Sequence, residues 1–404
     1  MAVEFEHFPV QGARNYYGAA LPLGLRVMKS KDGESDAPPL EESTETLKAL
    51  SQSGKIAELL DRHGAVLIRG IGHPSPGTFA TLVNTIEKAR GSHPHEQVGL
   101  AGKRTVMGEN IWSANEGAPT TRFYQHNEVG LLDQWYMETT RAELHATVFK
   151  VHKIPCQHSL LRCQQSQQRQ DKLHPVQRPG DHGLTLNRVG GATPIAHSEA
   201  VFERVLAEIP ELVEGIEKRG LGMKMLFREP GNEGKHNAFN WAGQYSFGQD
   251  FQPGDDEELK RAKAEKQVRR LTDDFRWLDD GSLELTQHIP GLRRHPVSGR
   301  PLWFNGLVGR HGITRDIGAL EPPHIGRDGM TYLPCVYGDE TPIPREFLDR
   351  LIDVIDQEEI YLTLEEGDLL LVDNFRVSHG REPWEGNRLV LVSMWDGAHQ
   401  IKAY

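Results

Sequence analysis

The sequence predicts an α+β fold in which helices flank a group of strands. Between Ser43 and Arg62, apolar residues recur at helical spacing, which is typical of an amphipathic helix. Short apolar runs indicate buried strands, and three of them fall late in the chain, at 302–305, 368–372 and 388–395. The pattern therefore predicts helices packed around strands, but it does not by itself choose an architecture.

Each further element follows from a local signal. Ser43 suits the N-cap of the first helix, and the run Gly-Ala-Val-Leu-Ile-Arg-Gly at 64–70 predicts a buried strand. Residues 382–387 are rich in turn formers, which predicts a hairpin or short loop that returns Arg388 towards His379. Three more helices are predicted, at 76–90, at 198–209 with Ser198 as the cap, and at 344–357 with Pro344 in the first turn.

Composition agrees with a soluble globular protein. The formal charge of −11 over 404 residues argues against a general binder of nucleic acid or of anionic membranes. Three cysteines, Cys156, Cys163 and Cys335, have no disulfide-framework spacing, which fits a reducing compartment. The N-terminus lacks signal-peptide features and no segment has the ~20 apolar residues of a membrane span. We therefore expect a cytoplasmic protein, and assembly into a homo-oligomer stays open.

Two stretches far apart in the sequence suggest one metal site. The first, at 123–128, carries His126 and Glu128, and the second, at 373–381, carries His379. Residues i and i+2 of an extended strand point to the same side, so His126 and Glu128 can face one cavity. Two imidazoles and one carboxylate can cap one face of an octahedral metal and leave three positions open, as in non-haem Fe(II) oxygenases.

Six motifs in order resemble the TauD/TfdA superfamily of Fe(II)- and 2-oxoglutarate-dependent dioxygenases, in particular its clavaminate-synthase-like members with a glutamate ligand. The motifs lie at 64–70, 126–128, 190–194, 295–305, 367–374 and 379–388. The resemblance covers about residues 60–396 and implies a double-stranded β-helix, or jelly-roll, core. We expect a single domain over 1–404, with an N-terminal extension at 1–42.

The resemblance implies a role for each site residue. His126, Glu128 and His379 would hold Fe(II). Arg388 would bind the far carboxylate of 2-oxoglutarate, because a guanidinium forms a bidentate pair with a carboxylate. Arg381, two residues from His379, is the second candidate for that role. Thr193 would donate its hydroxyl to the cosubstrate, and the alternative is a turn threonine before a proline.

The reaction implied is hydroxylation of an unactivated C–H bond, or desaturation or cyclisation, with O2 consumed and succinate and carbon dioxide released. Glu128 argues against halogenation, because it fills the position that a halide would need. We expect a small organic substrate and favour an intermediate of specialised metabolism. A catalytically impaired jelly-roll binding protein and a dioxygenase of macromolecules are the alternatives.

One stretch departs from the family pattern. Between Glu128 and Gly190 lie 61 residues, where the family has a short linker and one core strand. Residues 131–189 are therefore predicted to be an atypical insertion, much of it a polar loop. The insertion is either an active-site lid or a gene-model artefact such as a retained intron. A retained intron would also have displaced the expected core strand. We favour the artefact.

Overall fold

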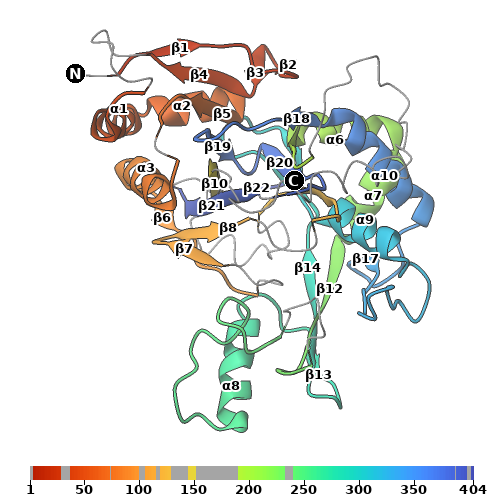
Figure 1. Cartoon of the computed structure of the whole chain (residues 1–404). Helices are drawn as coiled ribbons and strands as arrows, with labels where there is room; N and C mark the ends of the chain where they lie inside the picture. The colour runs from red at the N-terminus through yellow and green to blue at the C-terminus, as the bar shows by residue number, and fades with distance from the viewer. Residues whose placement is uncertain are drawn as a thin grey trace, which may run out of the picture.

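The computed structural model describes residues 3–28, 37–72, 74–99, 105–114, 119–128, 144–151, 190–232, 240–386, 388–397 and 402–404. Within them, a large nine-stranded sheet and the smaller sheet β18-β11-β20-β9 form the centre of the molecule (Figure 1). The large sheet runs in the order β1-β4-β5-β19-β10-β21-β8-β7, and β6 also pairs with β21. Its strands are β1 Phe5–His7, β4 Leu23–Val27, β5 Ala65–Arg69, β6 His93–Pro94, β7 Val106–Gly108, β8 Ile111–Ser113, β10 Leu144–Val151, β19 Leu369–Asp373 and β21 Leu389–Asp396.

The second sheet has the order β18-β11-β20-β9 among the described residues, and it carries the candidate site. Its strands are β9 Phe123–His126, β11 Thr193–His197, β18 Ile360–Leu362 and β20 Val377–Arg381. Strands alternate between the two sheets within two runs of the chain. In the first run, β9 and β11 belong to the small sheet and β10 to the large one; in the second, β18 and β20 belong to the small sheet and β19 and β21 to the large one. This alternation confirms the predicted double-stranded β-helix within an α+β fold.

The chain returns after His379 by a short loop and not by a hairpin, the other predicted alternative. β20 pairs with β9 and β11, whereas β21 pairs with β10. The turn formers at 382–387 therefore connect two sheets. They still bring Arg388, the residue before β21, to the end of the strand that carries His379.

The insertion predicted at 131–189 contains a core strand. β10 lies between β19 and β21 and pairs with both, with His145 opposite Asp373 and Trp395. The interpretation of a displaced core strand is therefore wrong for 144–151, because these residues fill the centre of the large sheet. Residues 129–143 and 152–189, and with them the choice between a lid and an artefact, lie outside the described residues.

The core between the two sheets is apolar. Ala65 and Leu67 of β5 join a cluster that includes Ile195 of β11 and Val377 of β20, while Val66 and Ile68 point to the opposite face and join a second cluster. This side-to-side alternation is that of a strand buried on both faces.

Helices α1 Leu40–Gln52, α2 Lys55–His63 and α3 Pro76–Ala89 cover the outer face of the large sheet (Figure 1). The single helix predicted over 43–62 is in fact two helices, because Gly54 adopts a φ of 77° at the break. α3 agrees with the prediction, and the Ser75 side chain accepts a hydrogen bond from Thr78 N. The N-terminal extension adds β1 and β4 to the large sheet, with β4 parallel to β5.

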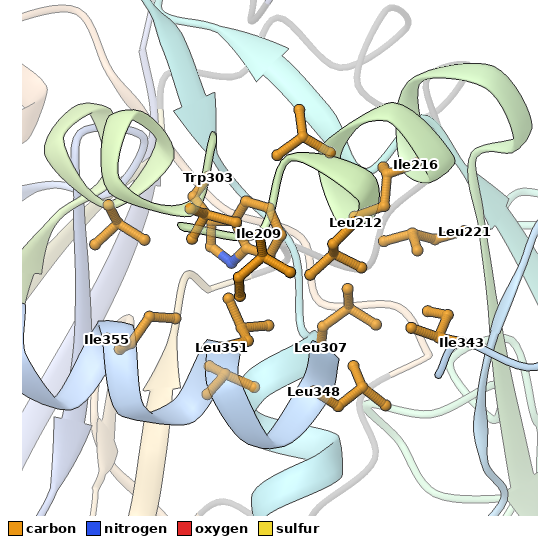
Figure 2. Close-up of a cluster of buried hydrophobic side chains, with 14 of the residues drawn as sticks. Ile209, Leu212, Ile216, Leu221, Trp303, Leu307, Ile343, Leu348, Leu351 and Ile355 are labelled. Atoms are coloured by element: carbon orange, nitrogen blue, oxygen red, sulfur yellow. The ribbon is translucent and has the colours of Figure 1, made fainter. Parts of the chain in front are cut away.

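A second group of helices packs beside the small sheet: α6 Ser198–Glu208, α7 Pro210–Arg219, α9 Leu307–Ile317 and α10 Arg345–Glu358. These helices share one cluster of buried apolar side chains. Figure 2 shows Leu348 and Leu351 of α10 facing Leu212 and Ile216 of α7 within it.

Three predicted caps are wrong in detail. α1 begins at Leu40 with Pro39 as its N-cap, so Ser43 lies inside the helix. The N-cap of α6 is His197 rather than Ser198, and Pro344 is itself the N-cap of α10 and does not lie in its first turn.

The remaining elements lie outside the two central sheets. A third sheet, with the order β13-β14-β12-β17, packs against α8 Glu257–Val268 and extends from the body (Figure 1). Its strands are β12 Leu221–Phe227, β13 Phe275–Trp277, β14 Leu283–Ile289 and β17 Cys335–Tyr337. The small strands are β2 Arg14–Tyr16, β3 Ala19–Leu21, β15 Leu292–Arg294, β16 Pro301–Trp303 and β22 Lys402–Ala403. β16 ends before Asn305, two residues earlier than expected. Cys335 is a buried free thiol, and the other two cysteines lie outside the described residues.

His197 predicts a dependence of stability on pH. Burial, and then the charge of Arg376, lower the pKa of His197 to about 3. The unfolded chain takes up this proton below about pH 6.5, whereas the folded protein does not until about pH 3, so stability falls as the pH decreases through this window. Between pH 7 and 5, wild type should lose about 2 kcal/mol more unfolding free energy than His197→Gln. Denaturant titrations at both pH values measure this, and equal losses would contradict it.

Candidate metal centre

Three predicted ligands meet where β9 and β20 pair. His126, the last residue of β9, lies opposite His379 in the antiparallel register, and the ring centroids are 4.6 Å apart. Nε2 of His379 lies 3.6 Å from Oε1 of Glu128. One donor atom from each of the three residues lies within 4.8 Å of the others, and Glu128 is buried. The tertiary structure therefore brings together the residues that the two motifs supply.

Glu128 reaches this position by a different route from the predicted one. We expected an extended strand with His126 and Glu128 on one face, but β9 ends at His126 and Glu128 lies in the turn that follows. Its backbone forms hydrogen bonds with the side chain of Asn374, in the turn that joins β19 to β20. The backbone of Glu128 is therefore held by a side chain from a distant turn rather than by the β-ladder.

Hydrogen bonding fixes which nitrogen of His126 faces the site. A carbonyl oxygen only accepts, so Nδ1 of His126 donates to Tyr124 O at 2.9 Å and Nε2 keeps its lone pair. On His379, Nδ1 is buried and has no hydrogen-bond partner among the described residues, while Nε2 is the nitrogen near Glu128. Two Nε2 atoms and one carboxylate thus form the donor set.

The pairing of β9 with β20 requires a glycine at position 380. The register shifts between His379 and Arg381, so that Phe123 rather than Tyr124 lies opposite Arg381. A Cβ added at Gly380 would lie 2.6 Å from Phe123 O, a backbone atom. The irregular pairing that sets His126 opposite His379 therefore depends on close approach of the two backbones.

The Gly380→Ala variant should disturb both stability and the site. The added methyl group has no room against the β9 backbone, so we expect a loss of about 1–3 kcal/mol in unfolding free energy together with weaker Fe(II) binding. Gly77→Ala in α3 is the control, because a Cβ there meets its nearest atom at 3.8 Å. Denaturant unfolding and anaerobic metal titration measure the two effects. Unchanged metal binding in Gly380→Ala would contradict this account of the pairing.

Behind the ligands, a buried polar network ties β9 to β20. Gln125 lies between Tyr124 and His126, and its side-chain oxygen accepts a hydrogen bond from Ser378 at 2.9 Å. The Gln125 amide donates to Glu359 at 3.3 Å. Burial raises the pKa of the Glu359 carboxyl, against the opposing charge of Arg122. Because both polar ends of Gln125 have partners, β9 is held at the edge of its sheet.

Arg388 lies against the glycine-rich motif that begins at Gly190. A Cβ placed on Gly191 would be 3.4 Å from Cδ of Arg388, and one on Gly190 would be 2.9 Å from Cα of Trp384. Both glycines have positive φ, of 81° and 74°, so residue type is restricted by conformation as well as by space. Nη1 of Arg388 donates to Ala114 O at 3.1 Å. Two of the predicted cosubstrate motifs therefore touch.

Arg381 has a different environment. Its guanidinium lies between two aromatic rings, 4.8 Å from the centroid of Phe123 and 4.4 Å from that of Trp384, and Nη2 donates to Thr121 O at 3.3 Å. The side chain is buried, at 6% exposure. The guanidinium carbon of Arg388 also lies 5.4 Å from the centroid of the Trp384 ring. Arg381 is thus packed into the wall beside the site by cation–π contacts.

Thr193 is the first residue of β11 and is buried, so it does not lie in the turn that the alternative interpretation required. Ile195 is opposite His379 in the register, and the backbone N–H of Glu382 donates to Ala192 O. Opposed residues of a pair share a face, as do residues i and i+2, so Thr193 is on the same face as His379.

Two residues of the site were not assigned a role by the sequence. Asn374 and Trp384 lie inside quoted motifs. The hydrogen bonds of Asn374 are to Glu128, far away in the chain, whereas Trp384 contacts Arg381 and Arg388, its near neighbours in sequence. Their only sequence signal is position: Asn374 follows the buried strand before His379, and Trp384 lies in the turn before Arg388.

The sequence matches the family described as "Taurine catabolism dioxygenase TauD, TfdA family" over residues 38–395, most of the chain. The protein belongs to the TauD/TfdA family. A clavaminate synthase-like protein of Arabidopsis thaliana is 24% identical over 352 residues, which are 87% of this chain and 86% of that protein. The dapdiamide synthesis protein DdaC of Enterobacter agglomerans is 32% identical over 209 residues, 51% of this chain and 57% of that protein.

Among solved structures, a taurine dioxygenase from Burkholderia xenovorans aligns over 99% of this chain and 94% of its own, with 12% identity and a TM-score of 0.43. Members of the TauD/TfdA family are Fe(II)- and 2-oxoglutarate-dependent oxygenases, and this protein is one of them. Its cofactor and cosubstrates are accordingly Fe(II), 2-oxoglutarate and O2. No helix of the described residues is long and apolar enough to cross a membrane.

The donor set of this TauD/TfdA enzyme fits its metal. Neutral imidazole and carboxylate are ligands that Fe(II) accepts, and three protein ligands leave positions for a cosubstrate and oxygen. Because Nδ1 of His126 donates to a backbone carbonyl, that ring presents a lone pair in a fixed direction. One carboxylate and two neutral rings would leave the Fe(II) centre with a net positive charge, which favours binding of the anionic 2-oxoglutarate.

Proposed function

We propose that the protein hydroxylates, or desaturates, a C–H bond of a small organic molecule, with release of succinate and carbon dioxide. The observation that carries the proposal is the assembled group of His126, Glu128 and His379 at the small sheet, whose strand β11 continues the glycine-rich motif that contacts Arg388. The similarity to DdaC, whose name assigns it to dapdiamide synthesis, supports a substrate from specialised metabolism.

In this proposal His126 and His379 bind Fe(II) through Nε2, and Glu128 binds it through a carboxylate oxygen. Tyr124 O keeps His126 in the tautomer that can act as a ligand. When bound, the metal and 2-oxoglutarate supply the oxidation of the C–H bond through oxidative decarboxylation of the cosubstrate. Glu128 occupies the position that a halide would need, so hydroxylation is favoured over halogenation.

Arg388 is proposed to bind the far carboxylate of 2-oxoglutarate, with Thr193 as a hydroxyl donor on the same wall. Contact with Gly191 supports Arg388, because this contact joins the two motifs that carry the predicted cosubstrate residues. Arg381 is proposed to support the wall rather than to bind the cosubstrate. Its position between Phe123 and Trp384 orients Trp384 against Arg388.

The aromatic residues near the ligands are proposed to exclude water. Phe123 lies edge-on to the His126 ring, with centroids 6.0 Å apart, and is 36% exposed. Trp384 is buried beside both arginines. A partly exposed apolar ring next to a metal ligand suits contact with the hydrocarbon part of a small substrate.

The assembled ligands and the family membership favour an enzyme over a binding protein with an impaired site. The formal charge of −11 counts against a nucleic-acid substrate. We also propose that the chain forms one catalytic domain, since β1 and β4 extend the large sheet and β22, near the C-terminus, pairs with β15.

Anaerobic reconstitution tests the function. Purified protein is titrated with Fe(II) and 2-oxoglutarate, and the expected result is a metal-to-cosubstrate charge-transfer band. Succinate release is then measured in air, first without and then with candidate amino-acid-like and sulfonate substrates. A compound that accelerates succinate release and is recovered with one added oxygen, or with two hydrogens removed, would identify the substrate class. Folded protein with neither the band nor succinate release would overturn the proposal.

A further inference from the structure

Asn374 bridges the two halves of the metal site. Its side chain is fully buried, at 0% exposure. Oδ1 accepts a hydrogen bond from Glu128 N at 2.8 Å, and Nδ2 donates to Glu128 O at 2.9 Å. A third bond runs from Nδ2 of Asn127 to Asn374 O at 2.6 Å. The amide of Asn374 thus pairs with Glu128 as a second β-strand would.

We propose that Asn374 is a positioning residue that holds Glu128 in register with His379, so that the three ligands are assembled before the metal binds. The inference rests on the proposed iron site. Glu128 lies beyond the end of β9, where the ladder with β20 no longer fixes the backbone. Asn374 lies five residues before His379 on the other arm of the site. One buried amide therefore connects the two arms.

The turn that presents Asn374 is itself fixed by Asp373. Oδ1 of Asp373 accepts backbone hydrogen bonds from Phe375 at 3.0 Å and Arg376 at 3.3 Å. Oδ2 accepts from Nε2 of His295 at 2.9 Å. With both carboxylate oxygens engaged, the backbone at 373–376 has little freedom, and the direction of the Asn374 side chain is set.

His295 begins the motif at 295–305, for which no chemical role was predicted. Its Nδ1 is within hydrogen-bond distance of the backbone N–H groups of Val297 and Ser298 and of Nη2 of Arg376. Because these groups only donate, Nδ1 is the acceptor and the ring proton lies on Nε2, where it is donated to Asp373. His295 therefore supports the turn and is 1% exposed, away from solvent.

The residue type at 374 follows from this geometry. The amide offers one acceptor and one donor to a backbone N–H and C=O at the same time, whereas an ionised carboxylate only accepts. Asn374→Asp would replace the donor with an oxygen facing Glu128 O, and a buried carbonyl would lose its partner. Asn374→Ser avoids the repulsion between oxygens but is too short to make both bonds.

Metal titration of the full chain, anaerobic and without 2-oxoglutarate, tests the proposal. Loss of a group that orients a metal ligand typically weakens metal binding by about 10–100-fold, and this is the expected effect of Asn374→Asp on the Fe(II) dissociation constant. The Fe(II) dissociation constant of Asn374→Ser should lie between those of Asn374→Asp and wild type. If the Asp variant does not fold, the Ser variant decides by the same measurement.

Asn305→Asp is the matched control. Asn305 is also buried, and its amide likewise bridges two backbone groups, Gly291 O at 2.9 Å and Leu307 N at 3.1 Å, but neither belongs to the metal site. The Asn305→Asp variant should lower the midpoint of thermal unfolding, as Asn374→Asp does. Its affinity for Fe(II) should change by no more than about twofold.

Two results would overturn the positioning role: Fe(II) affinity of both Asn374 variants within about twofold of wild type, or equal weakening by Asn305→Asp. Failure of the wild-type protein to bind Fe(II) would instead overturn the proposed iron site itself, and the role of Asn374 with it. The wild-type titration thus separates failure of the proposed function from failure of this inference.

Discussion

The His379→Ala variant is expected to lose specific Fe(II) binding and at least about 1,000-fold of its succinate-forming activity, because the chemistry depends on the bound metal. His379 is central to the arrangement, opposite His126 in the strand register and 3.6 Å from the Glu128 carboxylate. Removing its imidazole leaves two ligands. Metal binding is measured by anaerobic calorimetry, and activity by succinate release without a prime substrate.

His288→Ala is a suitable control for this variant. His288 is a histidine of the third sheet that pairs with Asp274 at the surface, so its removal should leave Fe(II) binding unchanged. A His379→Ala protein that retained wild-type affinity and activity would show that the ligand assignment is wrong. Loss of binding in both variants would point to a general effect on folding.

The second large effect is expected for Arg388→Ala, in the affinity for 2-oxoglutarate. Loss of a charge-assisted bidentate pair should raise the dissociation constant of 2-oxoglutarate about 100-fold. Fe(II) binding should remain, because Arg388 is not a ligand. The charge-transfer band, titrated with 2-oxoglutarate on the Fe(II)-loaded protein, measures this constant directly.

Two further variants sharpen the Arg388 result. Arg388→Lys keeps the charge without the planar fork and should recover only part of the affinity. Arg381→Ala removes the cation between Phe123 and Trp384 and should mainly lower stability. If Arg381→Ala weakens 2-oxoglutarate binding more than Arg388→Ala does, the cosubstrate role belongs to Arg381.

Much of the site could be predicted from the sequence, because the ligand types and the motif order are local properties. His126, Glu128 and His379 were chosen from residue type and spacing, and the structure brings them together. The path of the chain around them was harder to predict. A run of turn formers before Arg388 looks the same whether it joins two strands of one sheet or crosses between two sheets, and here it crosses.

The strand at 144–151 shows a similar limit. Its apolar alternation is short and is surrounded by polar sequence, so the pattern did not distinguish it from a loop. Its position between β19 and β21 is set by pairing with strands more than 200 residues later in the chain. Such pairings depend on the whole fold, and the neighbouring sequence carries no signal for them.

The sequence by itself determined the chemistry available to this protein: two imidazoles, a glutamate and an arginine in an order shared with the TauD/TfdA family. Tertiary structure alone decided how the carboxylate is held and which arginine touches the glycine-rich motif. The physical reason is that β9 ends before Glu128. The position of Glu128 therefore depends on Asn374, a side chain in the turn between β19 and β20, which only the folded chain brings near.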